Sequence, residues 1–216
     1  MAKMAATVDV VAPGRVMLGV GAGWNVREHE AYGWEFPSMR ERSDRLEEAC
    51  ELIRKLFHSG VDERIDYQGD YYTLKQAAFA PKSGNGQPIP IMVGGTGEKR
   101  TLKTLAMYGD KMNVIASPER VTHLSEVLAR HCENVGRDPE EIQKTVHVPI
   151  RIIRDEKKAK EVRGDNDWSM IGSPQYVIDR IGDFVKVGIS EFTPQIRPQR
   201  PEIYQELDEE VFSAFD

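Results

Sequence analysis

The sequence lacks the features that mark several protein classes. It has only two cysteines in 216 residues, too few for a disulfide framework, and neither Cys50 nor Cys132 has a partner at metal-ligand spacing. Both lie in helical patterns, so we expect reduced, mostly buried thiols. No apolar run approaches the roughly 20 residues that a membrane-spanning helix needs, and the first residues do not resemble a signal peptide. We therefore expect a cytoplasmic protein with no membrane partner.

Basic clusters and hydrolase motifs are also absent. The formal net charge is -6 and the pI is near 5.5, whereas nucleic-acid binding needs Lys and Arg gathered on one face. The sequence contains no nucleophile elbow, Ser/His/Asp set or paired carboxylates, so it names no catalytic residue. The five histidines are scattered, and we expect no metal. Only His29, which follows the turn at Trp24, is a candidate for a place near a site.

The residues that are present predict one α/β domain over residues 1–216. A chain that is 40% hydrophobic and 30% charged can bury one sizeable core. Short apolar runs alternate with amphipathic helices, and near-continuous apolar runs favour parallel strands covered on both faces. An open doubly wound sheet and a closed barrel both fit this pattern. The expected strands are 15–20, 89–93, 110–115, 146–153 and 189–196, the helices are 38–58, 98–107, 118–135 and 175–187, and a small hairpin covers 62–74.

A glycine-rich turn follows the second expected strand, and it has the clearest chemical signal. Gly94, Gly95, Thr96 and Gly97 precede a helix, so backbone N–H groups and the positive end of the helix could face an anion. Thr96, Lys99 and Arg100 could add donors. The spacing fits neither a Walker A loop nor G-x-G-x-x-G. The alternative is a tight connection that binds nothing.

A second glycine-rich segment ends the first expected strand. Gly21, Ala22 and Gly23 would let a flat ring lie against the backbone, with Trp24 or Asn25 at its edge. Close packing beneath a loop is the alternative. The charged residues 40–48 are more typical of an ion-paired helix start than of a catalytic site. Glycine-rich strand ends without a protein nucleophile suit an enzyme whose chemistry resides in an organic cofactor.

Several motifs, in their order, resemble the luciferase-like monooxygenase superfamily, particularly its coenzyme F-420-dependent oxidoreductases. Each motif is weak singly, but together they cover nearly the whole chain. They are Ala5-Ala6-Thr7-Val8-Asp9, Gly14-Arg15 with Gly19 to Trp24, Phe36-Pro37-Ser38 with the following Arg/Glu residues, Ile91 to Leu102, Tyr108 to Asn113, Cys132 to Pro139, and Gly172-Ser173-Pro174.

The resemblance implies a TIM barrel that holds FMN or the deazaflavin F-420 at the C-terminal ends of its strands. It implies that Gly94, Gly95, Thr96 and Gly97 bind the cofactor phosphate and that Gly21, Ala22 and Gly23 lie at the strand-four end of the pocket. The expected activity is transfer of hydride or electrons to a small organic substrate. The segment 98–100 looks more like the deazaflavin branch than the FMN branch.

Two departures from the family pattern affect these expectations. Met112 stands where the family usually has an aromatic residue. The chain also corresponds to about five parallel strands, numbers four to eight, of a partial barrel, and unpaired edge strands need covering. We therefore expect a homo-oligomer, a rearranged sheet or a second polypeptide at these edges. The alternatives to an active enzyme are a non-catalytic barrel subunit and, more weakly, a phosphosugar- or nucleotide-binding protein.

Overall fold

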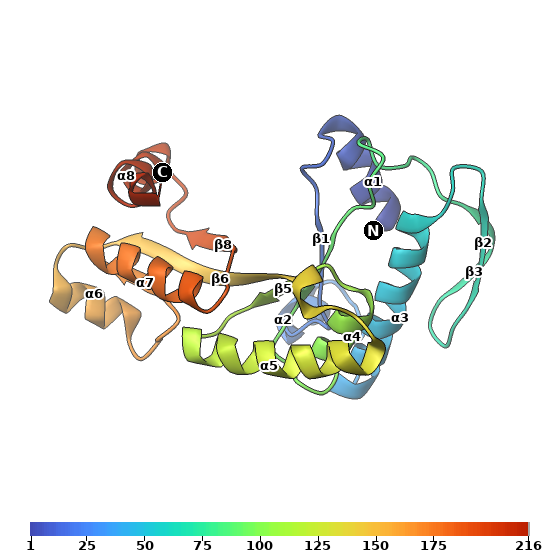
Figure 1. Cartoon of the computed structure of the whole chain (residues 1–216), viewed down its shortest axis with the longest axis horizontal. Coiled ribbons are helices and arrows are strands. Elements are labelled where there is room, and N and C mark those ends of the chain that lie inside the picture. The colour runs from blue at the N-terminus through green and yellow to red at the C-terminus, as the bar shows by residue number, and fades with distance from the viewer. Residues whose placement is uncertain (216) are drawn as a thin grey trace. The chain divides into compact units, whose positions relative to one another are not determined.

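The computed structural model describes residues 1–215 as alternating helices and strands (Figure 1). The chain forms two compact units: Met1–Met112 with Leu128–Ile142, and Asn113–Val127 with Gln143–Asp216. The strands are β1 (Leu18–Val20), β2 (Arg64–Gln68), β3 (Thr73–Ala78), β4 (Ile91–Gly94), β5 (Lys111–Val114), β6 (Gln143–Ile152), β7 (Met170–Gly172) and β8 (Glu191–Ile196).

The α-helices range from 6 to 20 residues in length. They are α1 (Ala2–Val11), α2 (Val26–Ala31), α3 (Met39–His58), α4 (Thr101–Tyr108), α5 (Pro118–Val135), α6 (Glu156–Arg163), α7 (Pro174–Lys186) and α8 (Pro201–Glu210), with the 3-10 segments η1 (Pro139–Glu141) and η2 (Phe212–Phe215). Within residues 1–215, none of them combines the length and the apolar character that crossing a bilayer requires.

The first unit is built around a parallel pair of strands. Leu18 of β1 lies opposite Ile91 of β4, and Val20 lies opposite Val93. Helices α3 and α4 pack together, and α4 contacts β4. The start of α3 is fixed locally, because the Ser38 side chain accepts a hydrogen bond from the backbone N–H of Glu41. The apolar face of α3 is buried at Leu46, Cys50, Leu52, Ile53 and Phe57.

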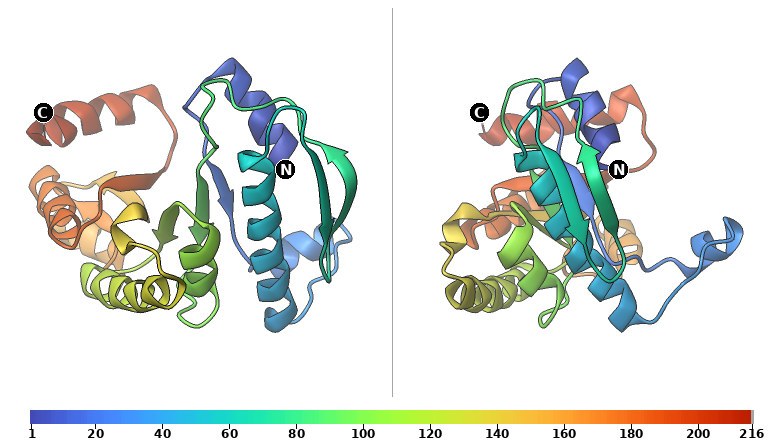
Figure 2. Two further views of the ribbon diagram at one scale, coloured as in Figure 1. Left: turned by 45° about the vertical axis from the view of Figure 1, so that its right-hand side comes forward. Right: turned by 90° about the vertical axis from the view of Figure 1, so that its right-hand side faces the viewer.

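The hairpin of β2 and β3 lies alongside α3 (Figure 2). Its turn is held by one carboxylate of the helix, because Glu48 accepts hydrogen bonds from the backbone N–H groups of Asp70 (3.0 Å), Tyr71 (3.1 Å) and Tyr72 (2.7 Å). Gly69 completes the fit, since a Cβ atom there would lie 1.9 Å from the Glu48 carboxylate. The turn therefore wraps closely around a side chain of α3.

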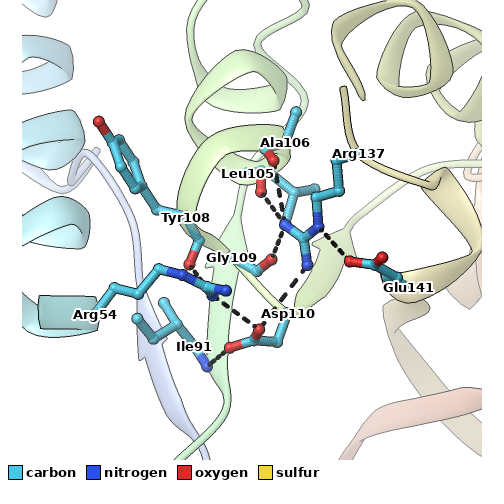
Figure 3. A network of polar contacts seen from close by, with 9 residues as sticks. All are labelled: Arg54, Ile91, Leu105, Ala106, Tyr108, Gly109, Asp110, Arg137 and Glu141. Carbon is cyan, nitrogen blue, oxygen red and sulfur yellow. Dashed lines mark hydrogen bonds and ion pairs between the residues drawn. The ribbon is translucent and has the colours of Figure 1, made fainter. Parts of the chain in front are cut away.

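The side chain of Arg137 binds the backbone at the C-terminal end of α4 (Figure 3), and this contact is called the arginine clamp below. Arg137 donates hydrogen bonds to the backbone carbonyls of Leu105, Ala106 and Gly109, and its side chain is 13% exposed. Asp110 lies 3.9 Å from Arg137 and 3.2 Å from Arg54 of α3, and it accepts a hydrogen bond from the N–H of Ile91. The clamp thus ties two helices to the beginning of β4, away from the strand's glycine end.

The second unit is built around the long strand β6. β8 pairs in parallel with residues 145–150 of β6, and β7 pairs in parallel with residues 150–152. Phe184 of α7 meets Phe192 of β8 edge to face at 6.1 Å, which places α7 over the apolar face of this sheet. On the opposite face of this sheet, the Asn113 side chain donates hydrogen bonds to the hydroxyls of Thr145 and Thr193.

The α/β class with parallel strands that the sequence predicted is confirmed, and so is the hairpin. Helices α3, α5 and α7 lie where their periodicity placed them, while α4 begins at Thr101, three residues later than expected. The short strand β7 and helices α1, α2, α6 and α8 were not predicted. Their periodic signal is brief: α2 has six residues, and α6 has eight and buries only Ala159.

Candidate functional site

The two glycine-rich segments meet at one edge of the first unit's sheet. Because β1 and β4 run in parallel, the residues after both strands emerge at the same C-terminal edge. A Cβ atom on Gly21 would lie 3.3 Å from the carbonyl oxygen of Gly94, and one on Gly94 would lie 3.6 Å from the carbonyl oxygen of Val20. The contact at Gly21 is tighter than a Cβ atom usually makes, whereas the one at Gly94 is an ordinary van der Waals distance. The sequence could not reveal this contact, because 73 positions separate the two glycines.

The turn after β4 presents unpaired donors to solvent. Gly95, Thr96 and Gly97 are exposed, and no hydrogen bond within residues 1–215 engages their backbone N–H groups. Gly95 has φ +129°, a conformation that L side chains rarely adopt. Consecutive free N–H groups beside a helix start form an anion-binding arrangement. The turn therefore has both the donors and the open space that a phosphate requires.

One expected donor of this turn is engaged elsewhere. Arg100 forms an ion pair with Asp44 of α3 and lies 3.8 Å from Glu47. The hydrogen bond with Asp44 raises the pKa of the Arg100 guanidinium above its ordinary value. The expectation that Arg100 adds a donor to the turn is wrong for this conformation, because its side chain is directed to α3. Thr96, within the turn, and Lys99, just after it, have exposed side chains.

A cavity of about 370 Å³ lies beside the end of β1. Gly21 and Ala22 line it, whereas Gly23, the third residue of the predicted ring site, does not, and His29 is a further lining residue. Trp24 is 83% exposed and is not among the lining residues, while the Asn25 side chain accepts a hydrogen bond from the N–H of Glu28 and caps α2. The lining residues are Met1, Gly19, Val20, Gly21, Ala22, His29, Glu35, Pro37, Arg42, Arg45, Leu46, Ala49 and Tyr72.

His29 is held in a defined orientation at this cavity. Its Nδ1 donates a hydrogen bond to the backbone carbonyl of Asn25 at 2.9 Å, and its ring meets the Phe36 ring edge to face at 4.8 Å. Gly23 has φ +77°, which favours glycine, and a Cβ atom there would be in ordinary contact with the ring, 3.5 Å from His29 Cε1. Sequence reasoning found His29 through its closeness to the turn. It missed Arg42 and Tyr72, because a helix start and a hairpin turn give no sign of facing the same cavity.

The charged start of α3 is largely ion-paired, as the sequence indicated. Arg45 pairs with Glu41 at 2.6 Å, and Asp44 pairs with Arg100. Cys50 and Cys132 are free and buried, which confirms the expectation that both side chains are buried. Among residues 1–215, no group of three His, Cys, Asp or Glu side chains is arranged to hold a metal ion.

Comparison with known proteins identifies a family and several relatives that this chain resembles. The family model for luciferase-like monooxygenases matches residues 1–169. An F420-dependent glucose-6-phosphate dehydrogenase of Kineococcus radiotolerans is 32% identical over 173 residues, which are 78% of this chain and 48% of that protein. A second protein with this name, from Amycolatopsis mediterranei, is 28% identical over 164 residues. The chain thus spans about half the length of these curated relatives.

Solved structures show the same fold at lower identity. An F420-dependent secondary alcohol dehydrogenase, solved with an F420-acetone adduct, superimposes with a TM-score of 0.83 at 24% identity, covering 100% of this chain and 74% of that one. The coenzyme F420-dependent tetrahydromethanopterin reductase of Methanopyrus kandleri gives a TM-score of 0.79 at 20% identity, covering 100% of this chain and 78% of the other.

Proposed function

The chain belongs to the luciferase-like monooxygenase family, and we propose that it is an oxidoreductase that uses coenzyme F-420, or FMN in its place, to transfer hydride or electrons to a small organic substrate. The observation that carries this proposal is the row of free backbone N–H groups at Gly95, Thr96 and Gly97. They lie at the C-terminal edge of parallel strands, which is where α/β folds bind ligands.

The residues of this chain would bind and orient the cofactor. The backbone N–H groups of residues 95–97 would hold its phosphate, and the small residues Gly21, Ala22 and Gly23 would leave room for its ring beside Gly94. The reduced ring supplies the hydride or electrons, so the protein needs no nucleophile of its own. Its contribution is position, electrostatics and exclusion of water.

Coenzyme F-420 is the first cofactor to test. The Kineococcus relative carries this coenzyme in its name, and the segment 98–100 is similar to the deazaflavin branch. Because Arg100 is held by Asp44, we propose that Thr96 and Lys99 are the side chains that assist the backbone. Glucose 6-phosphate, from the name of the same relative, is the first substrate to assay with F-420.

Cofactor titration tests this proposal directly. F-420, FMN and riboflavin would be added to the purified protein while ring fluorescence is followed. We expect F-420 and FMN to bind with micromolar or tighter affinity, and riboflavin, which lacks the phosphate, to bind at least about tenfold more weakly, a difference of about 1.4 kcal/mol. Absence of binding by both phosphorylated cofactors would contradict the proposed function.

The second candidate function is a barrel subunit that needs a partner chain. The exposed apolar side chains of α1 and the edge position of β1 favour it. Within residues 1–215, β1 has one strand neighbour, β4. On α1 the side chains of Met4, Val8 and Val11 are 71%, 56% and 84% exposed and recur at helical spacing. Such a stripe is typical of a covered surface. We propose that a second copy or another polypeptide covers it.

The mass of the protein in solution distinguishes a chain that works alone from a subunit that needs a partner. Sedimentation of the purified chain should give a mass above 24.5 kDa if a second copy covers the α1 stripe, and cofactor titration of the same sample then shows whether that assembly binds the cofactor. A stable, compact monomer that binds F-420 would contradict the need for a partner.

We further propose that residues 1–216 act as one domain and that the protein works in the cytosol, where free thiols such as Cys50 and Cys132 stay reduced.

A further inference from the structure

The cavity beside Gly21 has more cationic than anionic side chains in its lining. Arg42 and Arg45 line it together with His29, while Glu35 is the carboxylate among the lining residues. Arg45 is already paired, since Glu41 accepts hydrogen bonds from its Nε at 3.0 Å and its second nitrogen at 2.6 Å. For Arg42, in contrast, the described residues provide no carboxylate that would balance its charge.

Arg42 differs from the other arginines of α3 in having no carboxylate partner. Arg45 pairs with Glu41, Arg54 pairs with Asp110 at 3.2 Å, and Arg40 lies 4.0 Å from Asp44. Within residues 1–215, no ion pair engages Arg42. Its guanidinium donates to the backbone carbonyl of Pro37 at 2.8 Å and contacts the Met39 sulfur at 3.6 Å. Neither neighbour neutralises its charge.

The guanidinium of Arg42 is also partly desolvated. Its Nε is buried and has no hydrogen-bond partner among the described residues. One face of the group lies over the Phe36 ring, with 3.7 Å from the guanidinium carbon to the ring centroid. The Phe36 ring also makes an edge-to-face contact with the His29 ring. Stacking fixes the plane of a guanidinium and leaves its edge for a planar oxyanion, and leaving a buried charge without a partner is unfavourable.

We infer that the cavity beside Gly21 holds, next to the ring that the proposed function places at Gly21 and Ala22, an oxyanion of the bound ligand, a carboxylate or a phosphate, and that Arg42 binds this group. The cavity has about 370 Å³, which is ample for such a group, and it adjoins the proposed cofactor edge through Gly21 and Ala22. Arginine is the side chain best suited to planar, two-point recognition of carboxylate and phosphate. The inference rests on the proposed function for the identity of the ligand, but not for the oxyanion chemistry.

The test compares ligands with and without acidic groups. Arg42→Gln removes the charge, and Arg40→Gln, on the same helix with its side chain 88% exposed, is the matched control. We expect Arg42→Gln to weaken F-420 about tenfold or more and riboflavin not at all, with Arg40→Gln unchanged. Weakening of F-420 alone assigns the oxyanion to the acidic tail beyond the phosphate, and equal weakening of FMN assigns it to the phosphate, which Arg42 would then hold in place of the turn at residues 95–97. Unchanged binding of both by folded Arg42→Gln overturns the inference.

A second readout separates this inference from the proposed function. If the native protein binds no flavin or deazaflavin, the proposed function fails, and inorganic phosphate then tests the subsite. A rise in the thermal midpoint with phosphate that is lost in Arg42→Gln and kept in Arg40→Gln supports the subsite. Equal behaviour of the three proteins overturns it. Should Arg42→Gln not fold, Arg42→Lys, which keeps the positive charge but loses the planar fork, is expected to lose part of the F-420 affinity and of the phosphate effect, and native-like values of both overturn the inference.

Discussion

The carbonyl oxygen of Gly94 lies 3.3 Å from the position that a Cβ atom on Gly21 would occupy. This contact joins the ends of two parallel strands, and it brings two glycine-rich segments that are distant in sequence to one edge. The backbone of one segment and the cavity of the other can therefore serve a single ligand. The site is built mainly from main chain, so its chemistry depends on glycine positions more than on reactive side chains.

Substitution of Gly95 should weaken cofactor binding beyond its effect on stability. The φ of Gly95 is +129°, so Gly95→Ala would move the backbone and misdirect the N–H groups of the turn. We expect at least about a tenfold loss of F-420 affinity by fluorescence titration. Gly86→Ala is the control, because Gly86 also has a positive φ, +74°, and a Cβ there meets nothing within 4 Å. Equal affinity losses in both variants would contradict a specific role for the turn.

Removal of the Arg137 guanidinium should destabilise the fold. Arg137→Met would leave the carbonyls of Leu105, Ala106 and Gly109 without this donor, at a cost of about 2–3 kcal/mol in the free energy of unfolding. Urea denaturation measures this loss. Arg154→Met is the comparison, because its side chain is 60% exposed and exposed ion pairs contribute about 0–1 kcal/mol. Similar losses in the two variants would contradict the clamp.

The hairpin turn should open when either side of its contact with α3 is altered. Glu48→Ala removes the acceptor of three backbone N–H groups, and Gly69→Ala places a methyl group 1.9 Å from that carboxylate. We expect both variants to raise hydrogen exchange at residues 70–72, and the double variant to exceed Glu48→Ala only slightly, because both changes break one contact. Glu51→Ala, which loses a single hydrogen bond from Tyr67, should leave exchange in the turn unchanged. Additive effects of the two changes would contradict a shared contact.

The buried Asp9 should make stability depend on acid pH. The Ser83 hydroxyl and the backbone N–H groups of Gly84 and Gly14 donate to this carboxylate, and the Ser83 hydrogen bond is the largest cause that lowers its pKa below the ordinary 3.8. A lowered pKa in the folded state means that the contribution is present above pH 3.8 and is lost as pH falls through the folded-state value. Thermal midpoints measured from pH 5 downward should show this decline, and a smaller decline is expected in Asp9→Asn.

The two thiols should resist alkylation in the folded protein. Burial raises the pKa of Cys50 to about 12, and burial also raises the pKa of Cys132. Because the thiolate is the reactive form, iodoacetamide at pH 8 should label neither residue in native protein and both in urea. Rapid native labelling of Cys50 would indicate that α3 detaches from the core.

The sequence alone was sufficient for the features that arise from neighbouring residues. The apolar periodicity of residues 38–58 predicted a helix of nearly the observed extent, and the short apolar runs before Gly21 and Gly94 predicted buried parallel strands. These signals are local, since hydrogen bonding and side-chain spacing within a few residues determine them. The glycine segments themselves were also recognised, with the chemistry that their free N–H groups allow.

Only the tertiary structure decided how charged side chains are shared among these elements. Arg100 follows the phosphate-binding candidate in sequence, yet it pairs with Asp44, while Arg42, which resembled one more member of an ion-paired helix start, has no carboxylate partner. Such partners lie far apart along the chain, and a charged side chain pairs with whichever group the packing of helices and strands brings within about 4 Å. The separation of two residues along the sequence does not determine their distance in space. The donors of the site could therefore be placed only after the fold was known.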